Sequence, residues 1–158
     1  MPALNDGDPF PPLSLAAVGG GRISLPDDLA GSWSVVLIYR GSWCPYCNAQ
    51  LAAFARAAGT FAELGIRIVA LSADDATAAA ALAGKLGRDV PVGYDADADA
   101  IAAATGAYVN DAPKYLHSTG FVLDPEGRVR LAVYSTGAIG RLVPEDVVGL
   151  VRYLIAHP

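Results

Sequence analysis

The sequence predicts an α/β fold in which a mixed central sheet carries helices on both faces. Two apolar runs, at 34–39 and 66–71, are each followed by a segment with helical spacing, which is typical of parallel strands joined by helices. Two further apolar runs, at 120–123 and 129–134, flank a turn at 124–127, so we expect an antiparallel hairpin there. A last helix, from about Pro144 to His157, closes the pattern.

The first 30 residues form a prelude that we expect to contain a short β-hairpin. Residues 13–15 and 22–25 alternate polar and apolar side chains around the glycine turn at 19–21. A buried strand then follows at about 34–39. A helix begins at Pro45, because proline is well tolerated at the first helical position, where its missing N–H is not needed. Gly59 is a weak point in this helix.

The middle of the chain continues the alternation of strands and helices. After the strand at 66–71 we expect an Ala-rich helix at 75–86, a short strand at 90–94 and a short helix at 97–105. No linker, repeat or charge block interrupts residues 1–158. We therefore expect a single domain, which at this size buries roughly 68–70% of the surface exposed by the unfolded chain.

Charge and hydropathy exclude several classes of function. The formal net charge is −5, and no stretch concentrates Lys and Arg, so the attraction that drives binding to nucleic acid or anionic membrane is missing. No run reaches 18 apolar residues, and the N-terminus has neither a basic start nor an apolar core of a signal peptide. We expect a cytoplasmic protein that binds neither nucleic acid nor membrane.

The only two cysteines, Cys44 and Cys47, stand three positions apart where the helix after the 34–39 strand begins. Residues at this spacing share one helix face, so a small rotation brings the two sulfur atoms within disulfide range. In a reducing compartment such a pair is more often catalytic or metal-binding than structural. A zinc site would need further ligands, and the chain has no second cysteine pair and only two histidines, 40 residues apart.

The order of these motifs resembles the thioredoxin fold, and the prelude and middle elements resemble its peroxiredoxin branch, the alkyl hydroperoxide reductase and thiol-specific antioxidant family. The similarity covers nearly the whole chain. The fragments that carry it are Gly7-Asp8-Pro9 before Leu13-Ser14-Leu15, Val36-Leu37-Ile38-Tyr39, Trp43-Cys44-Pro45-Tyr46-Cys47, Val69-Ala70-Leu71-Ser72-Ala73-Asp74, Tyr94-Asp95, and Phe121-Val122-Leu123-Asp124-Pro125-Glu126-Gly127.

The family's usual active-site motif is altered in this chain. Typical members carry Pro-x-x-x-Thr-x-x-Cys, and this pattern places the attacking cysteine at Cys47, the threonine at Cys44 and the proline at Arg40. The family's distant arginine, counted back from the Phe121 strand, falls on Ser118. The chain thus resembles peroxiredoxin-like proteins with a thioredoxin-type Cys-x-x-Cys.

Two routes lead to the same Cys44–Cys47 disulfide. In a disulfide reductase, Cys44 at the helix start attacks the substrate and Cys47 resolves the mixed disulfide. In a peroxidase, Cys47 attacks the peroxide and becomes a sulfenic acid that Cys44 captures. The sequence leaves the order open, and it also allows a redox sensor or partner-binding module without turnover.

Several other residues are candidates for the environment of the thiolate. Arg40 and Arg141 could replace the missing hydrogen-bond donors, and Trp43 could shield the disulfide. The dipeptide Pro45-Tyr46 is the one that many glutaredoxins carry. The remaining candidates are Ser118 and Thr119, at the position where thioredoxins place a cis-proline, and His117, which is either a proton donor or a loop residue without a role.

We therefore expect a thiol-dependent oxidoreductase with antioxidant activity that reduces peroxides or protein disulfides. The alternatives are a thioredoxin- or glutaredoxin-type disulfide reductase without peroxidase activity, and the non-catalytic module. We expect no cofactor beyond an external thiol reductant of the thioredoxin or glutathione type. The resemblance implies a monomer or a homodimer.

Overall fold

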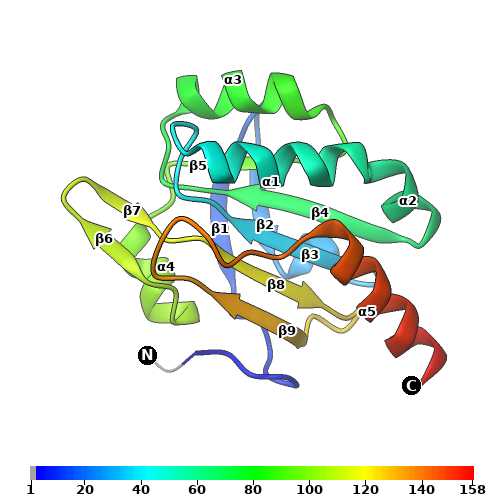
Figure 1. Cartoon of the computed structure of the whole chain (residues 1–158). Coiled ribbons are helices and arrows are strands. Elements are labelled where there is room, and N and C mark those ends of the chain that lie inside the picture. Colours follow the sequence, from blue (N-terminus) through cyan, green and yellow to red (C-terminus); the bar gives the residue numbers. More distant parts are fainter. Residues whose placement is uncertain (1–2) are drawn as a thin grey trace.

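The computed structural model describes residues 3–158 and contains a seven-stranded mixed sheet in the order β2-β1-β5-β4-β3-β8-β9 (Figure 1). The strands of this sheet are β1 Leu13–Ala17, β2 Arg22–Leu25, β3 Trp33–Ile38, β4 Ile66–Leu71, β5 Val92–Tyr94, β8 Thr119–Leu123 and β9 Val129–Tyr134. The helices are η1 Asp27–Leu29, α1 Pro45–Arg56, α2 Ala58–Glu63, α3 Ala76–Leu86, α4 Ala98–Thr105 and α5 Pro144–Ala156.

The pairing of the strands confirms the predicted mixed sheet. Strands β3, β4 and β5 run parallel, whereas β8 is antiparallel to both β3 and β9, and β1 is antiparallel to β5 and β2. The predicted N-terminal hairpin is therefore built onto the sheet, beside β5. The predicted hairpin at 120–134 supplies β8 and β9 at the other edge.

Successive residues of the central strand β3 face opposite sides of the sheet, and both sides are buried. Val35 and Leu37 pack with α1, α2, α3 and α5, whereas Val36 and Ile38 pack with α4 and the N-terminal segment. The sequence of a strand that is covered on both faces is a continuous run of apolar residues, as it is at 35–38 of β3. No helix in the described part of the chain is long and apolar enough to cross a membrane.

The helix termini follow the capping pattern of the sequence. Asp75 and Asp97 accept hydrogen bonds from the third residue beyond them, at 2.9 and 3.1 Å, and so cap α3 and α4. The long helix expected from Pro45 is divided, because α1 ends at Arg56 and α2 begins at Ala58. The break lies beside the predicted weak point, Gly59.

One element was missing from the predicted pattern. Strands β6 Val109–Asp111 and β7 Lys114–Leu116 form a separate two-stranded sheet, which extends beyond the main sheet next to α4 (Figure 1). Each strand has only three residues, and their sequence, VND and KYL, shows no alternation long enough to predict a strand. This hairpin matters because it carries a residue that contacts the cysteine environment.

Candidate functional site

The two cysteines lie where the carboxyl end of β3 passes into the N-terminus of α1. In open α/β sheets the carboxyl ends of the strands are the usual position of ligand sites. Cys44 is the N-cap of α1, with extended backbone, and Cys47 is in the first turn. Both cysteines are 0% exposed, and both thiols are free.

The backbone at the start of α1 places N–H groups on both sulfur atoms. The Cys47 N–H donates to Cys44 Sγ at 3.4 Å, which is the side-chain cap of the helix. The Arg40 N–H donates to Cys47 Sγ at 3.3 Å. Unpaired N–H groups at a helix N-terminus favour a negative charge. The predicted helix start thus gives Cys44 the setting of a thiolate.

Arg141 contacts both sulfur atoms from the loop before α5. Its Nη2 lies 3.1 Å from Cys47 Sγ and 3.6 Å from Cys44 Sγ. The predicted role of Arg141 near the thiolate therefore agrees with its position. The family pattern places an arginine at position 118, whereas the guanidinium of Arg141 reaches the sulfur atoms from the loop that follows β9.

Gln50 fixes the orientation of Arg141, and no local pattern in the sequence pointed to it. Its Oε1 accepts from Arg141 Nη1 at 2.9 Å, while its Nε2 donates to the carbonyl of Leu142 at 2.9 Å. Arg141 Nε also donates to the carbonyl of Ala138 at 2.8 Å. Two nitrogen atoms of the guanidinium, Nε and Nη1, are thus bound to neighbouring groups, and the third, Nη2, contacts the sulfur atoms.

Arg40, the residue in the family's proline position, lies on the other side of the pair. Its Nη1 is 3.7 Å from Cys44 Sγ, and its Nη2 donates to the hydroxyl of Tyr115 at 2.9 Å. The guanidinium carbon lies 5.0 Å from the centre of the Trp43 ring and 5.1 Å from that of Tyr115, within cation–π range. The predicted placement of Arg40 in the thiolate environment agrees with these contacts.

The surroundings shift the pKa values of the two thiols in opposite directions. Burial works to raise the pKa of Cys44, but hydrogen bonds from the Cys47 thiol and N–H, together with Arg40 and Arg141, hold that pKa below its usual value. Burial and the hydrogen bond given to Cys44 raise the pKa of Cys47. Cys44 is therefore the more acidic of the two thiols.

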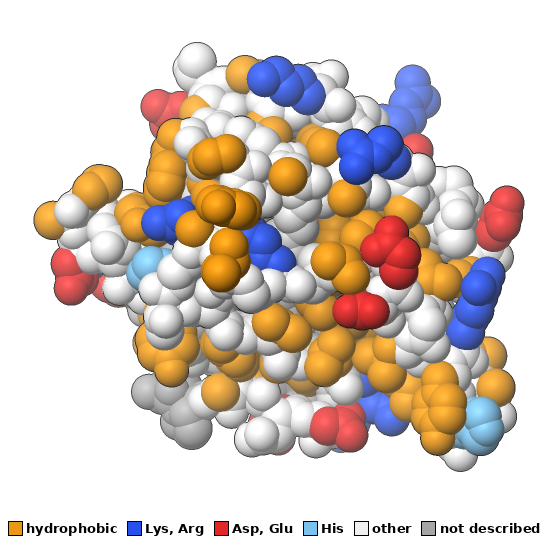
Figure 2. All heavy atoms as spheres, in the orientation of Figure 1, with side chains coloured by type: hydrophobic (Ala, Val, Ile, Leu, Met, Phe, Trp, Pro, Cys, Tyr) orange, Lys and Arg blue, Asp and Glu red, His pale blue; other side chains and the backbone are white. Residues whose placement is uncertain are grey.

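The aromatic residues form an exposed rim. Trp43 is 54% exposed and packs edge-on against Tyr115 at 4.9 Å, and Tyr46 is 53% exposed. Gly41 permits this position of Trp43, since a Cβ on residue 41 would lie 2.1 Å from Trp43 Nε1. Figure 2 shows hydrophobic and basic side chains together at the N-terminal end of α1. Pro45, the first residue of α1, is also exposed.

Ser118 and Thr119, candidates for the surroundings of the thiolate, have hydrogen-bond partners other than the two sulfur atoms. Both are buried: the Ser118 carbonyl accepts from the Ser135 N–H, and the Thr119 hydroxyl donates to the carbonyl of His117. Ser118 precedes β8, whereas Thr119 is its first residue and pairs with Ile38 and Tyr134.

His117 is connected to the site through an aromatic neighbour and not through a sulfur atom. Its half-buried ring packs edge-on against Tyr115 at 5.5 Å. Burial and the charge of Arg40 lower the pKa of His117. Tyr115 itself, on β7, is the second site residue that the sequence did not reveal, because the hairpin that carries it was not predicted.

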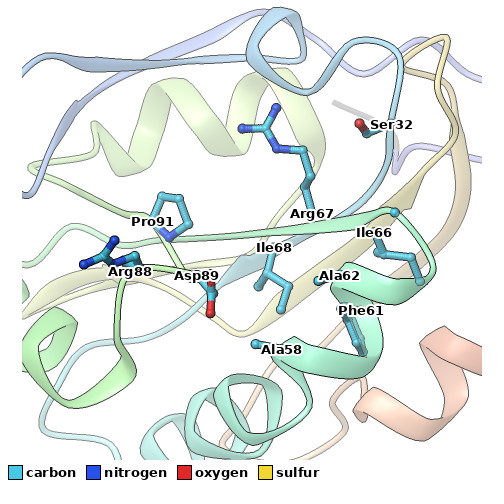
Figure 3. Close-up of a pocket in the computed structure, with 11 residues that line it drawn as sticks. Ser32, Ala58, Phe61, Ala62, Ile66, Arg67, Ile68, Arg88, Asp89 and Pro91 are labelled. Atoms are coloured by element: carbon cyan, nitrogen blue, oxygen red, sulfur yellow. The ribbon is translucent and has the colours of Figure 1, made fainter.

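A cavity of about 360 Å³ lies away from the cysteines, between α2, the start of β4 and residues 88–91 (Figure 3). None of its lining residues is hydrogen-bonded to a sulfur atom. Among residues 3–158, no three His, Cys, Asp or Glu side chains gather as ligands for a metal ion.

Comparisons with known proteins agree with this geometry. The model of the AhpC/TSA family matches residues 7–132. A peroxiredoxin of Treponema denticola is 32% identical over 98% of this chain and 74% of its own length, and one of Chlorobaculum tepidum is 30% identical over 92% and 69%. Both similarities extend over most of the two chains compared.

Solved structures share the fold at low sequence identity. A cysteine-to-serine mutant of peroxiredoxin 6 of Arenicola marina superposes with a TM-score of 0.84 at 18% identity, covering 97% of this chain and 74% of its own. AhpC of Mycobacterium tuberculosis superposes at 0.82 and 21% identity, covering 98% and 95%.

A thioredoxin-like fold that holds two adjacent thiols beside paired guanidinium groups defines a thiol-dependent oxidoreductase. The chain belongs to the AhpC/TSA family, as its agreement with the family model over residues 7–132 shows.

Proposed function

We propose that the protein is a thiol peroxidase that reduces peroxides by cycling Cys44 and Cys47 between dithiol and disulfide. The observation that carries this proposal is the convergence of two guanidinium groups on the sulfur pair. Arg141 lies 3.1 Å from Cys47 Sγ, and Arg40 lies 3.7 Å from Cys44 Sγ. Such donors stabilise negative charge on the oxygen that leaves when a peroxide is cleaved.

Cys44 is the attacking residue in this proposal. Its thiolate attacks one peroxide oxygen, so that an S–O bond forms while the O–O bond breaks, and the departing oxygen takes a proton from water. The sulfur of Cys47 then attacks the sulfenic sulfur of Cys44. An S–S bond forms, and hydroxide leaves and combines with the thiol proton of Cys47 as water.

The assignment of Cys44 as the attacking residue rests on its position and on the lowered pKa of its thiol. It caps α1, receives the Cys47 N–H, and lies within reach of both guanidinium groups. The pKa of Cys44 is lowered and that of Cys47 is raised, so Cys44 is the more acidic thiol of the pair. The family pattern favours the reverse order, in which Cys47 attacks the peroxide. The proposed order therefore differs from that of typical family members in the cysteine that attacks first.

The cycle requires two electrons from outside. An external thiol reductant attacks the Cys44–Cys47 disulfide, passes through a mixed disulfide, and leaves as its own disulfide while both cysteines return to thiols. We propose a reductant of the thioredoxin or glutathione type. The exposed rim of Trp43 and Tyr46 beside Cys44 supports contact with such a partner. The proposed cycle uses no other cofactor.

Cysteine-to-serine variants test the order of attack. Wild type, Cys44→Ser and Cys47→Ser are mixed with hydrogen peroxide or an organic hydroperoxide, and sulfenic acid is trapped with dimedone and located by mass spectrometry. We expect Cys47→Ser to accumulate a sulfenic acid on Cys44, and Cys44→Ser to react no faster than a free thiol. A sulfenic acid that forms on Cys47 of Cys44→Ser at the wild-type rate would reverse the assignment.

Disulfide reduction is the second candidate function, and the N-cap position of Cys44 favours it. A thiolate at a helix N-terminus with an exposed Trp43 beside it is also suited to attack a protein disulfide. The same Cys47→Ser variant, mixed with a protein disulfide, would then retain a mixed disulfide on Cys44. The ratio of the two rates in wild type, peroxide against disulfide, decides which activity dominates.

A further inference from the structure

The hairpin β6–β7 makes a contact with the site that the peroxidase cycle leaves unexplained. This hairpin is not part of the main sheet. It is held to the body by the buried side chain of Leu116 and by an exposed ion pair of Lys114 with Asp99, while the His117 N–H bound to the carbonyl of Tyr108 closes the base of the hairpin. Leu116 anchors β7, and this places the neighbouring Tyr115 beside the loop that precedes α1.

Tyr115 holds the Arg40 guanidinium in three ways. Its hydroxyl accepts from Arg40 Nη2 at 2.9 Å, and its ring lies 5.1 Å from the guanidinium carbon. The same ring packs against Trp43, which itself lies 5.0 Å from that carbon. A long arginine side chain is thereby restricted to one orientation, with Nη1 directed at Cys44 Sγ. Arg40 Nε is buried without a hydrogen-bond partner, so these contacts are the ones that hold the group.

We propose that Tyr115 is a positioning residue that fixes Arg40 over Cys44, so that the separate hairpin β6–β7 sets the reactivity of the attacking thiolate. The proposal deepens the proposed function, because it rests on Cys44 as the attacking thiolate. Tyr115 does not touch a sulfur atom; it acts through Arg40. A guanidinium that is free to rotate away stabilises a thiolate less than one held in place, since orientation is then lost.

Cys44 Sγ is approached by two positive charges and by hydrogen-bond donors of α1. Arg40 and Arg141 approach from the two loops, the Cys47 thiol and N–H approach from α1, and His117 adds no hydrogen bond to the sulfur. Arg141 is held by Gln50 and by the carbonyl of Ala138, and not by Tyr115. A change at Tyr115 therefore alters the contribution of Arg40 and leaves that of Arg141 in place.

The Tyr115→Phe variant separates positioning from packing, because it removes the hydroxyl and retains the ring. The rate of alkylation of Cys44 by iodoacetamide, measured against pH with the product located by mass spectrometry, reports the thiolate without any peroxide. We expect the midpoint to rise by about half a pH unit, so that the rate below the midpoint falls about threefold. Tyr115→Ala, which also removes the ring, raises it by about one unit. Tyr108→Phe, an exposed residue next to the same hairpin, is the matched control and leaves the midpoint unchanged.

A double-mutant cycle tests whether Tyr115 acts through Arg40. In an Arg40→Gln background the Tyr115→Phe substitution has nothing to position, so we expect no further shift of the midpoint. An equal shift with and without Arg40, or no shift in the Tyr115→Phe single variant, overturns the proposal. Peroxide turnover is measured separately: a protein that shows the shift but consumes no peroxide retains this inference and loses the proposed peroxidase.

Discussion

Nη2 of Arg141 lies 3.1 Å from Sγ of Cys47, although 94 residues separate the two in the chain. The contact joins the first turn of α1 to the loop between β9 and α5, and it places a permanent positive charge on the redox pair. The typical family member uses an arginine at the start of the hairpin strand; here a different loop supplies the group. The reactivity of the pair therefore depends on a residue that becomes its neighbour only in the folded chain.

Loss of the Arg141 charge is expected to slow peroxide reduction strongly. Removal of one donor that stabilises developing charge costs on the order of a hundredfold in rate or more, so Arg141→Gln lowers kcat/KM by at least that factor. Arg141→Lys retains the positive charge but loses the guanidinium group, which contacts Gln50 and Cys47 Sγ at the same time. We expect this variant to react at an intermediate rate. Stopped-flow measurement of peroxide consumption checks both. Arg152→Gln, exposed on α5, is the matched control with the wild-type rate.

Gln50 is expected to act on the thiols only by orienting Arg141. Gln50→Leu removes two hydrogen bonds, and the one that orients Arg141 is worth about 1 kcal/mol, so we expect a fall of about fivefold in kcat/KM. Gln50→Glu retains the acceptor for Arg141 Nη1 and restores most of the rate. The same peroxide assay measures both variants. A Gln50→Leu protein that is less stable but reacts at the wild-type rate would show that Gln50 is structural only.

Gly120 is expected to be required for the packing beneath Arg141. A Cβ on Gly120 would lie 2.6 Å from Cδ1 of Leu142, whose carbonyl anchors Gln50. Gly120→Ala therefore lowers the free energy of unfolding by about 1–3 kcal/mol, measured by urea denaturation. Gly149→Ala, at an open position in α5, raises it by about 0.5–1 kcal/mol, because alanine loses less conformational freedom in a helix. Equal stability of both variants would contradict this account.

Tyr39 is expected to make the folded protein sensitive to alkaline pH. Burial raises the pKa of Tyr39 to about 12, with a smaller contribution from Asp74, whereas an unfolded tyrosine ionises near 10. The folded state thus retains a proton that the unfolded state loses. The stability from this group is complete below pH 10 and declines as the pH rises from about 10 to about 12, by up to about 1.4 kcal/mol per pH unit.

Urea denaturation at a series of pH values, compared between wild type and Tyr39→Phe, isolates this slope from that of other groups. We expect the difference between the two proteins to change above pH 10, in favour of Tyr39→Phe. The matched control Tyr108→Phe, at an exposed position, follows the wild-type curve. Parallel curves for all three proteins would exclude Tyr39 as the source.

Local sequence patterns predicted most of the fold, for physical reasons that lie within short segments. The continuous apolar run at β3 can be accommodated only in a strand buried on both faces, and Pro45 marks the start of α1. The hairpin β6–β7 escaped prediction because strands of three residues show no period. The division at Ala57 between α1 and α2 was foreseen only as a weak point at Gly59.

The sequence by itself determined the redox pair, because the spacing of Cys44 and Cys47 at a helix N-terminus is a local property. It also indicated Arg40, four residues before Cys44, as a neighbour of the thiolate. The tertiary structure decided which of the candidates contact the sulfur atoms: it placed Arg141 on both of them, added Gln50 and Tyr115 as partners of the two arginines, and gave Ser118 and Thr119 other hydrogen-bond partners. Such contacts join segments far apart in the chain, and their geometry depends on how the strands and loops pack, which no local pattern contains.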